Sequence, residues 1–218
     1  MGQKVHPRGF RIGKLYSWSS NWYADVKDYQ KFLLEDIKLR EFLFEKLKLA
    51  GITDVQIDRS INTIKITLNV ARPGVVIGRG GSGLEELKKL IASKLTPDPK
   101  SGKPPKFELN VVEMKNPDLS ARLIGLRLTD QLIKRYPHRR AVAQALEKTI
   151  SAGAKGIKIV LAGRIAGTEI SRTEKYTQGN MPLSTIRSDI DYFEQPALTK
   201  FGYVGIKVWI YKGEKDLK

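Results

Sequence analysis

The apolar residues of this chain recur with two periods, and the order of these periods constrains the fold more than any other feature. A period near 3.6 residues indicates a helix with one buried face, and a period of two indicates a strand with one buried face. In the first half, helical spacing covers residues 28–50 (one helix or two) and 84–95, and alternation covers residues 52–58, 61–70 and 107–114. A short apolar segment lies at residues 75–77. The first half therefore predicts the order helix, strand, strand, short helix, helix, strand.

A second unit begins where Asn116 and Pro117 interrupt the pattern. Helical spacing covers residues 118–136 and 138–152, and alternation then covers residues 157–161, 170–176, 188–193 and 203–211. This order predicts two helices packed on a mostly antiparallel sheet. The expected fold class is α+β, with a basic N-terminal arm and lead-in at residues 1–37, an αββααβ domain at residues 38–114 and a C-terminal α/β domain at residues 115–218.

The charge balance narrows the kinds of partner. Lys and Arg number 39 and Asp and Glu number 23, which gives a formal net charge of +16. Such an excess makes a compact chain repel itself and favours a polyanionic partner, with nucleic acid preferred over an anionic membrane. The chain has no Cys, and no apolar run approaches the roughly 20 residues of a membrane span. We therefore expect a cytoplasmic protein that binds a polyanion, with neither a thiolate metal site nor a membrane span.

The stretch GRGGSG at residues 78–83 places four glycines before a predicted helix. Gly78, Gly80 and Gly83 satisfy G-x-G-x-x-G, the spacing of dinucleotide-binding loops. A dinucleotide site needs a full strand before the glycines, but only residues 75–77 separate them from the breaker Pro73-Gly74. The position for the acidic ribose ligand falls in a loop rich in Pro and Lys, and the residues after the last glycine lack the Lys of a Walker loop. The dinucleotide interpretation is therefore disfavoured.

The same letters also satisfy G-x-x-G, through Gly78, Arg79, Gly80 and Gly81. Glycines let a loop approach a sugar-phosphate backbone that a Cβ would hold away. Free N–H groups at the start of the following helix can then face phosphate oxygens, and Arg79 adds a forked charged donor. A purely structural turn is the alternative at this position.

The first 24 residues contain cations and no acidic residue, and glycines and Pro7 interrupt any regular period. This pattern predicts an extended basic arm. The candidates for contact with phosphate in the arm are Lys4, His6, Arg8, Arg11 and Lys14. Interleaved aromatic residues either stack on bases or anchor the arm to its own domain. Anchoring is the interpretation that we favour for Trp18 and Trp22.

A basic corner surrounds Pro137 between the two predicted C-terminal helices. Its members are Lys134, Arg135, His138, Arg139 and Arg140. Lys134 and Arg135 end the first helix, where the helix dipole favours cations. Arg139 and Arg140 open the second helix, where each cation works against the dipole by about 0.3–1 kcal/mol. An RNA phosphate would reverse the sign of that cost; the alternative is a solvated charged turn.

A catalytic alternative rests on Asp189 and Asp191, which lie two apart on a predicted strand and would face one side, as metal ligands do. Cross-strand ion pairs with Arg164, Arg172 and Arg187 are the better account of these carboxylates. Two classes of function remain, a structural RNA-binding component of a ribonucleoprotein and an RNA-modifying or nucleotide-dependent enzyme. We favour the first, and expect no metal and no cofactor.

The frame around G-x-x-G resembles the type II KH domain, whose Gly-rich loop clamps about four nucleotides of single-stranded backbone. A wider resemblance is carried by "MGQKVHPRGFRIG", "ARPGVVIGRGG", "GAKGIKIVLAGRIAGTEISRTEKY", "MPLSTIRSDIDY" and "GIKVWIYKGE". These stretches are similar, over nearly the whole chain, to the bacterial family of the third protein of the small ribosomal subunit. That resemblance implies a KH domain and a C-terminal α/β domain in the head of the small subunit, in contact with ribosomal RNA and at the messenger RNA entrance.

The resemblance also implies site residues and partners. Through "RRA", Arg139 and Arg140 match the family's cations at the messenger entrance, whereas Ala143 stands where the family usually has Lys. The expected entrance patch is Arg135, His138, Arg139 and Arg140, and the candidate ribosomal RNA contacts are Lys4, His6, Arg8, Arg11, Lys14, Arg164, Arg172 and Lys175. The implied partners are small-subunit ribosomal RNA, messenger RNA and the tenth and fourteenth small-subunit proteins.

Overall fold

A computed structural model describes residues 4–60, 63–94 and 106–215 of the chain. The chain divides into two compact units. The glycine-loop unit is Trp18–Lys115, and the C-terminal unit joins the arm up to Ser17 to the chain from Asn116 onward. The junction after Lys115 lies one residue from the predicted start of the C-terminal domain. The other predicted boundary, between residues 37 and 38, falls inside a helix, so the lead-in is continuous with the domain that follows it.

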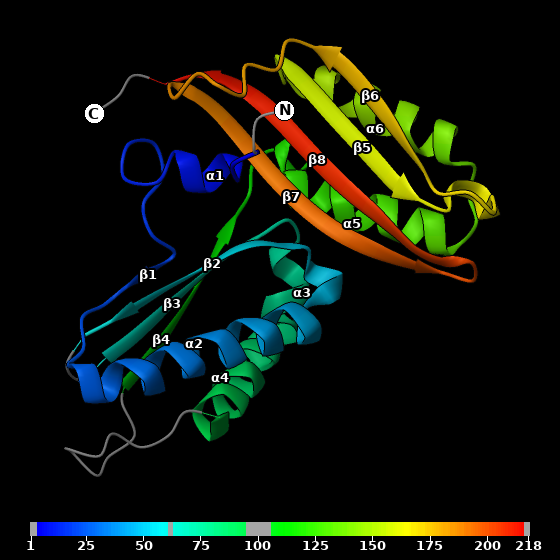
Figure 1. The fold of residues 1–218 in the computed structure, drawn as a ribbon. Helices are drawn as coiled ribbons and strands as arrows, with labels where there is room; N and C mark the ends of the chain where they lie inside the picture. The colour runs from blue at the N-terminus through cyan, green and yellow to red at the C-terminus, as the bar shows by residue number, and fades with distance from the viewer. Residues whose placement is uncertain (1–3, 61–62, 95–105, 216–218) are drawn as a thin grey trace. The chain divides into compact units, whose positions relative to one another are not determined.

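From α2 onward the glycine-loop unit has the predicted order of helices and strands, and a short strand, β1, that was not predicted precedes it (Figure 1). Its elements are β1 (Ser20–Asn21), α2 (Val26–Lys46), η1 (Lys48–Ala50), β2 (Ile52–Arg59), β3 (Thr63–Val70), α3 (Pro73–Ile77), η2 (Arg79–Gly81), α4 (Ser82–Lys94) and β4 (Lys106–Glu113). The strands form one sheet in the order β1-β2-β3-β4. β2 and β3 are antiparallel, and β3 and β4 are parallel. The start of the second strand predicted at residues 61–62 and most of the loop at residues 96–106 lie outside the described residues.

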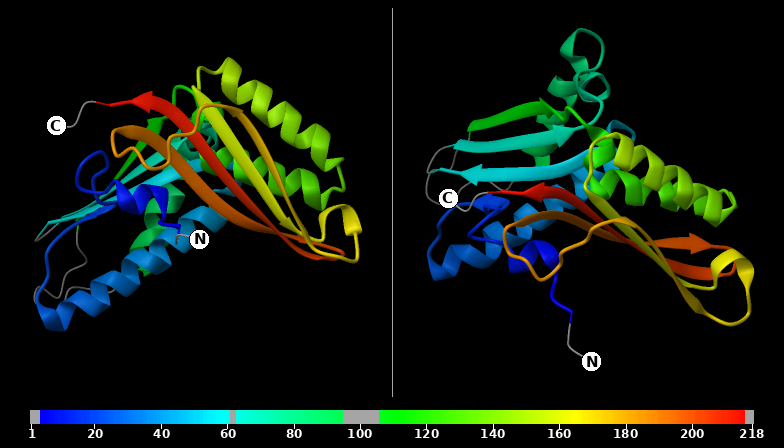
Figure 2. Two further views of the ribbon diagram at one scale, coloured as in Figure 1. Left: turned by 45° about the horizontal axis from the view of Figure 1, so that its top comes forward. Right: turned by 90° about the horizontal axis from the view of Figure 1, so that it is seen from above.

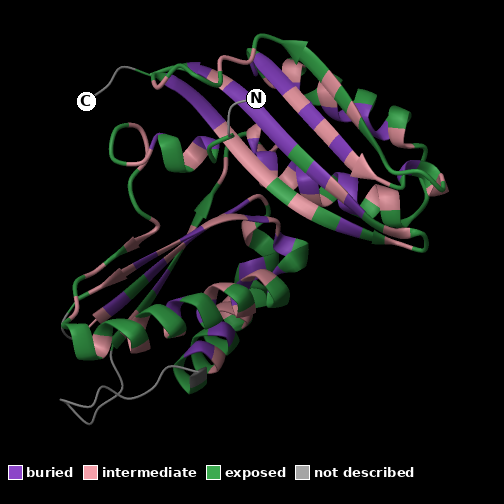
Figure 3. Ribbon diagram, in the orientation of Figure 1, coloured by how far each residue is buried: buried purple, intermediate pink, exposed green. Residues whose placement is uncertain are grey.

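One face of this sheet is buried by the helices. Along β3 the residues Ile64, Ile66, Leu68 and Val70 are buried, and they alternate with partly or fully exposed residues (Figure 3). The buried set packs with Leu43 of α2 and Ile91 of α4 in one hydrophobic cluster. Because the alternation has a period of two and the helices have one apolar stripe each, the sequence pattern alone dictates which faces meet.

The edge strand β1 is fixed to this unit by a buried carboxylate. Asp36 of α2 accepts hydrogen bonds from the Ser20 hydroxyl at 3.0 Å and from the indole N–H of Trp22 at 2.9 Å. It also pairs with the guanidinium of Arg59 at 2.5 Å. The indole of Trp22 therefore anchors the chain, as predicted, whereas Trp18 is 65% exposed and the anchoring interpretation does not hold for it.

The C-terminal unit contains a four-stranded sheet with two long helices on one face (Figure 2). Its elements are α1 (Pro7–Phe10), η3 (Pro117–Leu119), α5 (Ala121–Ile133), α6 (His138–Ser151), β5 (Gly156–Gly163), η4 (Ile165–Gly167), β6 (Arg172–Gly179), β7 (Ser188–Thr199) and β8 (Gly202–Glu214). The strand order is β6-β5-β8-β7, and every neighbouring pair is antiparallel. The predicted pair of helices on an antiparallel sheet is therefore confirmed.

The two faces of this sheet differ in character. On β5, Ile157, Ile159 and Leu161 are fully buried in the cluster that includes the helices. Lys158 and Val160 alternate with them and point to the opposite, open face. Burial by α5 and α6 thus covers one side only, and the other side carries Lys158 beside a smaller buried cluster of Ile190, Trp209 and Tyr211.

The prediction of an extended N-terminal arm is wrong. Residues Pro7–Phe10 form the short helix α1, and the Nδ1 atom of His6 accepts a hydrogen bond from the N–H of Gly9 at 3.2 Å. The side chain of Arg11 is fully buried, and its guanidinium donates to the carbonyl oxygens of Pro7, Leu183 and Thr185 at 2.8–2.9 Å. The Arg11 guanidinium is therefore not available to RNA, because it is buried and already donates hydrogen bonds to three carbonyl oxygens of its own chain.

Candidate nucleic-acid interface

The glycine loop adopts a backbone conformation that side chains other than glycine rarely permit. The φ angles of Gly78, Gly80 and Gly81 are 71°, 61° and 85°. At Gly78, ψ is −177°, and a Cβ would lie 2.9 Å from the amide nitrogen of Gly83. That combination of φ and ψ belongs to glycine almost exclusively. The turn itself therefore requires Gly78, and the positive φ angles of Gly80 and Gly81 favour glycine there for the same backbone reason.

Gly80 and Gly81 have open space around them, whereas a Cβ on Gly83 would lie 2.8 Å from the carbonyl oxygen of Val76. Among the described residues, no atom lies within 4 Å of a Cβ built on Gly80 or Gly81, so packing does not explain their lack of a side chain. Arg79 is exposed, and α4 begins directly after the loop. Two apolar side chains just before the loop, Val75 and Ile77, are also exposed. The loop thus combines exposed glycine backbone next to a helix start, one cation and an apolar edge, which is what a phosphate backbone with attached bases needs.

The corner between α5 and α6 is tighter than predicted. Helix α5 ends at Ile133, not at residue 136, and Arg135 has a left-handed φ of 59°. The N–H of Tyr136 donates to the carbonyl of Gln131, and the N–H of Arg135 donates to the carbonyl of Leu132. This is the Schellman ending of a helix, in which the left-handed position is usually glycine. Arg135 occupies it, and its side chain is exposed.

Arg139 and Arg140 lie in the first turn of α6, as predicted, and both are exposed. The first turn contains no acidic residue. Their charges therefore oppose the helix dipole, at a cost of about 0.3–1 kcal/mol each. Within the described residues, Arg135 and Arg140 have no carboxylate partner within 4 Å. The corner presents cations that the protein itself does not neutralise.

The start of α6 is held to β6 by Glu174. This carboxylate lies 3.0 Å from Nε2 of His138, 2.7 Å from Nε of Arg172 and 2.5 Å from the hydroxyl of Tyr176. The hydrogen bond from Tyr176 lowers the pKa of Glu174 most strongly, and Arg172 and His138 lower it further against the effect of burial. Burial and Glu174 raise the pKa of Tyr176, and the charge of Arg139 opposes that rise. His138 thus has a structural role in orienting the helix that carries both arginines.

The candidate ribosomal RNA contacts separate into different places. Arg164 is exposed near the corner, where its Nε donates to the carbonyl of Thr168 at 2.9 Å. Arg172 is engaged by Glu174, whereas Lys175 lies on the open face of the sheet. Lys4 and Lys14 are exposed and Arg8 is half-buried in the folded arm.

A row of side chains that the sequence analysis did not single out crosses the open face. The ammonium of Lys158 lies 5.3 Å from the ring centre of Trp209, which packs against Tyr192, and the ring of His6 meets Tyr192 edge-on at 4.8 Å. Burial lowers the pKa of Lys158, and the charges of Lys4 and Lys175 lower it further. Three ammonium groups close enough to repel one another form a local positive field that an anion would relieve. From the sequence, the alternation of apolar and polar residues along β5 could have predicted that Lys158 lies on this face.

Asp189 and Asp191 do not form a shared metal site. Asp189 is buried, accepts a short hydrogen bond from the hydroxyl of Tyr16 and pairs with Lys215 at 2.6 Å. Asp191 accepts from the N–H of Ala121 at 2.9 Å, which caps the start of α5. The expected ion pairs are therefore present, but the partners are lysines of the last strand and its end, with Lys212 at 3.9 Å from Asp191, and not the three arginines.

Residues 4–60, 63–94 and 106–215 contain no group of three or more His, Cys, Asp or Glu side chains able to hold a metal ion. Among the helices in those same ranges, none is both long enough and apolar enough to span a membrane.

Comparison with known proteins gives two family matches and many similar chains. A profile described as "KH domain" matches residues 38–119, and one described as "Ribosomal protein S3, C-terminal domain" matches residues 128–210. The "Small ribosomal subunit protein uS3" of Desulforamulus reducens is 45% identical over 98% of this chain and 93% of its own length. Those of Vesicomyosocius okutanii and Pelotomaculum thermopropionicum are 48% and 47% identical over 98% of this chain, and 90% and 89% of their own lengths.

Proposed function

Because the chain belongs to the family of small ribosomal subunit protein uS3, we propose that it lines the messenger RNA entrance of the small subunit and helps to position messenger RNA for translation. The family membership itself makes the chain a ribosomal protein with an RNA-binding KH domain, and a structural component rather than an enzyme. The proposal adds a position, the basic corner between α5 and α6, and a ligand, the messenger backbone.

The observation that supports this proposal is the placement of Arg139 and Arg140. Both guanidinium groups stand in the first turn of α6, where the helix dipole disfavours them, and Glu174 fixes that turn through His138. A phosphate chain passing the helix start would be attracted both by the N–H groups of the turn and by the two arginines. Ala143 lies one turn further along the same helix and adds no third cation.

The ribosomal RNA contacts form a second part of the proposal. The cations of the open face, Lys4, Lys158 and Lys175, repel one another unless an anion lies between them, which favours a phosphate contact there. Lys14, Arg8 and His6 belong to the folded arm beside β7, and the glycine loop at Gly78–Gly81 is a separate candidate on the other unit. The tenth and fourteenth small-subunit proteins are proposed as neighbours on family resemblance alone.

Ribosomes that carry the double substitution R139A/R140A test the messenger contact. We expect slower unwinding of a messenger hairpin placed at the entrance, because two cations that hold the strand are removed, while subunit assembly judged by sedimentation stays intact. The matched control is K148A/K155A, which removes two exposed charges at the far end of α6 and beyond it. Equal unwinding by wild-type and R139A/R140A ribosomes would contradict the proposal.

A further inference from the structure

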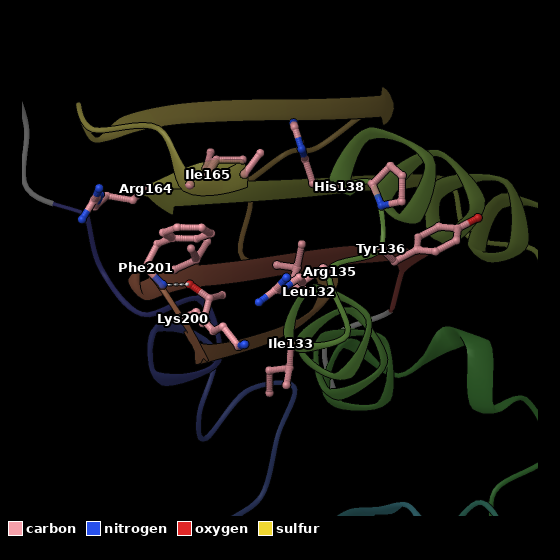
Figure 4. A pocket seen from close by; sticks show the side chains of 14 residues that line it. Leu132, Ile133, Arg135, Tyr136, His138, Arg164, Ile165, Lys200 and Phe201 are labelled. Carbon is pink, nitrogen blue, oxygen red and sulfur yellow. Dashed lines mark hydrogen bonds between the residues drawn. The ribbon is translucent and has the colours of Figure 1, made fainter.

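A pocket of about 210 Å³ opens beside the basic corner, within the C-terminal unit (Figure 4). Three segments distant in sequence form its walls: the end of α5 with the turn into α6, the turn η4 after β5, and the tight turn between β7 and β8. The buried side chains of Ile165 and Val204 contribute apolar lining. Neither the glycine loop nor the first turn of α6 beyond His138 contributes to it.

Backbone strain is concentrated at this pocket. Among the described residues, Arg135 and Ala166 are the two that have a positive φ without being glycine, with values of 59° and 56°. Both line the pocket, one from the corner and the other from η4. Each left-handed residue with a Cβ is energetically unfavourable, and such residues are found preferentially at ligand sites. Their occurrence in two separate turns that line one pocket favours a ligand site there.

An aromatic platform forms one end of the pocket. The ring of Phe201 packs against Gly167, because a Cβ built on Gly167 would lie 2.8 Å from a ring carbon. Phe201 is nevertheless 49% exposed. The turn that carries it is fixed, because Thr199 donates its hydroxyl to the carbonyl of Gly202 and accepts from the N–H of Phe201. In Figure 4, Tyr136 lies at the opposite end with its hydroxyl pointing away.

Cations surround the platform without carboxylate partners. Arg135, Arg164 and Lys200 all line the pocket and are all exposed. Within the described part of the chain, no Asp or Glu lies within 4 Å of their charged groups. Arg164 uses Nε for the carbonyl of Thr168, which leaves its two terminal nitrogens for a ligand. In Figure 4 the charged groups of Arg135 and Lys200 lie between the two aromatic rings.

We propose that this pocket holds one unstacked nucleotide of an RNA chain, with the base against Phe201 and the flanking phosphates beside Arg135 and Lys200 on one side of the ring and Arg164 on the other (Figure 4). The volume is below the roughly 300–1,000 Å³ of pockets for drug-sized ligands, which suits a single base. Sequence-tolerant stacking on an aromatic ring beside cations is the usual way in which proteins hold unpaired bases. The site is distinct from the Arg139 and Arg140 contact, and it rests on the proposed function only in requiring that this unit meets RNA.

An acidic peptide is the competing ligand for a cationic pocket. Its carboxylates would satisfy the three cations, but its side chains would leave the exposed ring of Phe201 without a flat partner. A nucleotide supplies both the flat ring and the anion, and the formal charge of +16 already favours a polyanion with many phosphates. The observations therefore favour RNA over peptide.

The test uses the purified full-length chain and two short RNA duplexes that differ only in one bulged 2-aminopurine. The duplex contacts of the two probes are the same, so the ratio of their dissociation constants isolates the extrahelical base. We expect the bulged duplex to bind at least about fivefold tighter, the lower end of what base stacking supplies. The fluorescence of 2-aminopurine should fall on binding, because stacking on an aromatic ring quenches it.

Two variants and two matched controls locate the effect. F201L keeps an apolar side chain over Gly167 but removes the ring, and K200A removes an exposed cation of the same turn. Y203L removes an exposed aromatic ring of β8, whose side chain alternates with that of the pocket-lining Val204 and so lies on the other sheet face. K148A removes an exposed cation at the far end of α6. F201L and K200A should reduce the preference for the bulge, and the two controls should keep it. Urea unfolding of each variant checks that the unit remains folded.

The outcomes separate the two proposals. If wild-type protein binds both duplexes equally, or if F201L and K200A both keep the full preference and the fluorescence change, the pocket proposal is wrong while the messenger contact of Arg139 and Arg140 stands. If an acidic peptide displaces the bulged duplex at Phe201 more strongly than a single-stranded RNA does, the ligand class is wrong. If R139A/R140A ribosomes unwind hairpins normally but the bulge preference is present, the proposed function fails and the pocket remains.

Discussion

The imidazole of His138 lies 3.0 Å from the carboxylate of Glu174, and this contact joins the first residue of α6 to the middle of the edge strand β6. The same carboxylate binds Arg172 and Tyr176. A helix start that bears two opposed cations would otherwise fray, since Arg139 and Arg140 both work against its dipole. The contact between His138 and Glu174 therefore connects local helix stability with the position of the arginines proposed to meet messenger RNA.

The first prediction concerns that carboxylate. E174Q removes its charge and should lower the stability of the start of α6 by about 1–3 kcal/mol, because charge-assisted hydrogen bonds to Arg172 and His138 are weakened. Hydrogen exchange at the first amides of α6 measures this local effect. Amides of α4 in the other unit are the internal control and should be unchanged. Unaltered exchange in α6 would show that the network does not hold the helix.

A second prediction follows from the left-handed backbone of Arg135. R135G should stabilise the C-terminal unit by about 0.5–1 kcal/mol, since it removes the roughly 1–2 kcal/mol cost of a Cβ at positive φ but adds about 0.4–1 kcal/mol of unfolded-chain entropy. Urea titration followed at the indole resonance of Trp209 gives the value, with Trp22 reporting on the other unit. R135A is the matched control: it removes the same charge but keeps the Cβ, so it should give no gain. Equal stability of R135G and R135A would refute the strain argument.

The third prediction concerns acid stability. Burial would raise the pKa of Asp189, but hydrogen bonds from Lys215 and Tyr16 outweigh burial and lower the pKa below its ordinary value. The ionised carboxylate therefore stabilises the fold above the unfolded-state pKa of about 4, and this stability is lost as the pH falls through the lower folded-state pKa. D189N should lose about 1–3 kcal/mol at pH 7 and show a flatter dependence below about pH 4. Urea titrations across this range, read at Trp209, measure both; an unchanged pH profile in D189N would assign the effect elsewhere.

The fourth prediction separates the two roles of the loop glycines. Gly80 has φ 61° and ψ 19°, a left-handed conformation that Asn tolerates, and it has open space around it. G80N should leave the glycine-loop unit folded but weaken binding of a single-stranded RNA roughly fivefold or more, because the side chain keeps the backbone at a distance. G78A should instead destabilise the unit by about 1–3 kcal/mol, because its backbone conformation is restricted to glycine. Fluorescence anisotropy and urea titration at Trp22 distinguish the two, and full RNA affinity in G80N would exclude the loop as a close contact.

Much of the fold was predictable because it depends on local spacing. The alternation of Ile64, Ile66 and Leu68 defined a strand with one buried face, and the structure buries these residues against the helices as expected. The four glycines at residues 78–83 marked a tight turn before a helix. Predicted helix ends were less accurate. Helix α5 stops at Ile133 because Arg135 takes the left-handed position. The sequence could not predict this end, because the residue at that position is not a glycine.

The sites were predictable only where their residues are neighbours in sequence. Arg139 and Arg140 were found as a pair because one helix turn carries both. Arg11 was misassigned to the surface because its three carbonyl partners include Leu183 and Thr185, more than 170 positions away. Lys200 and Phe201 were not predicted, because the other residues that line the pocket, such as Arg135 and Arg164, lie far from them in sequence.

From residue 28 onward, the sequence by itself determined the order of the main helices and strands and their buried faces, and its composition determined the excess of positive charge. The tertiary structure alone decided which cations remain available. Antiparallel pairing of β7 with β8 and the turn after β5 bring Phe201, Arg164 and Arg135 around one cavity, while folding of the arm removes Arg11 from the surface. Charge is a property of the residue, but its availability depends on which distant backbone carbonyls and carboxylates the fold places beside it.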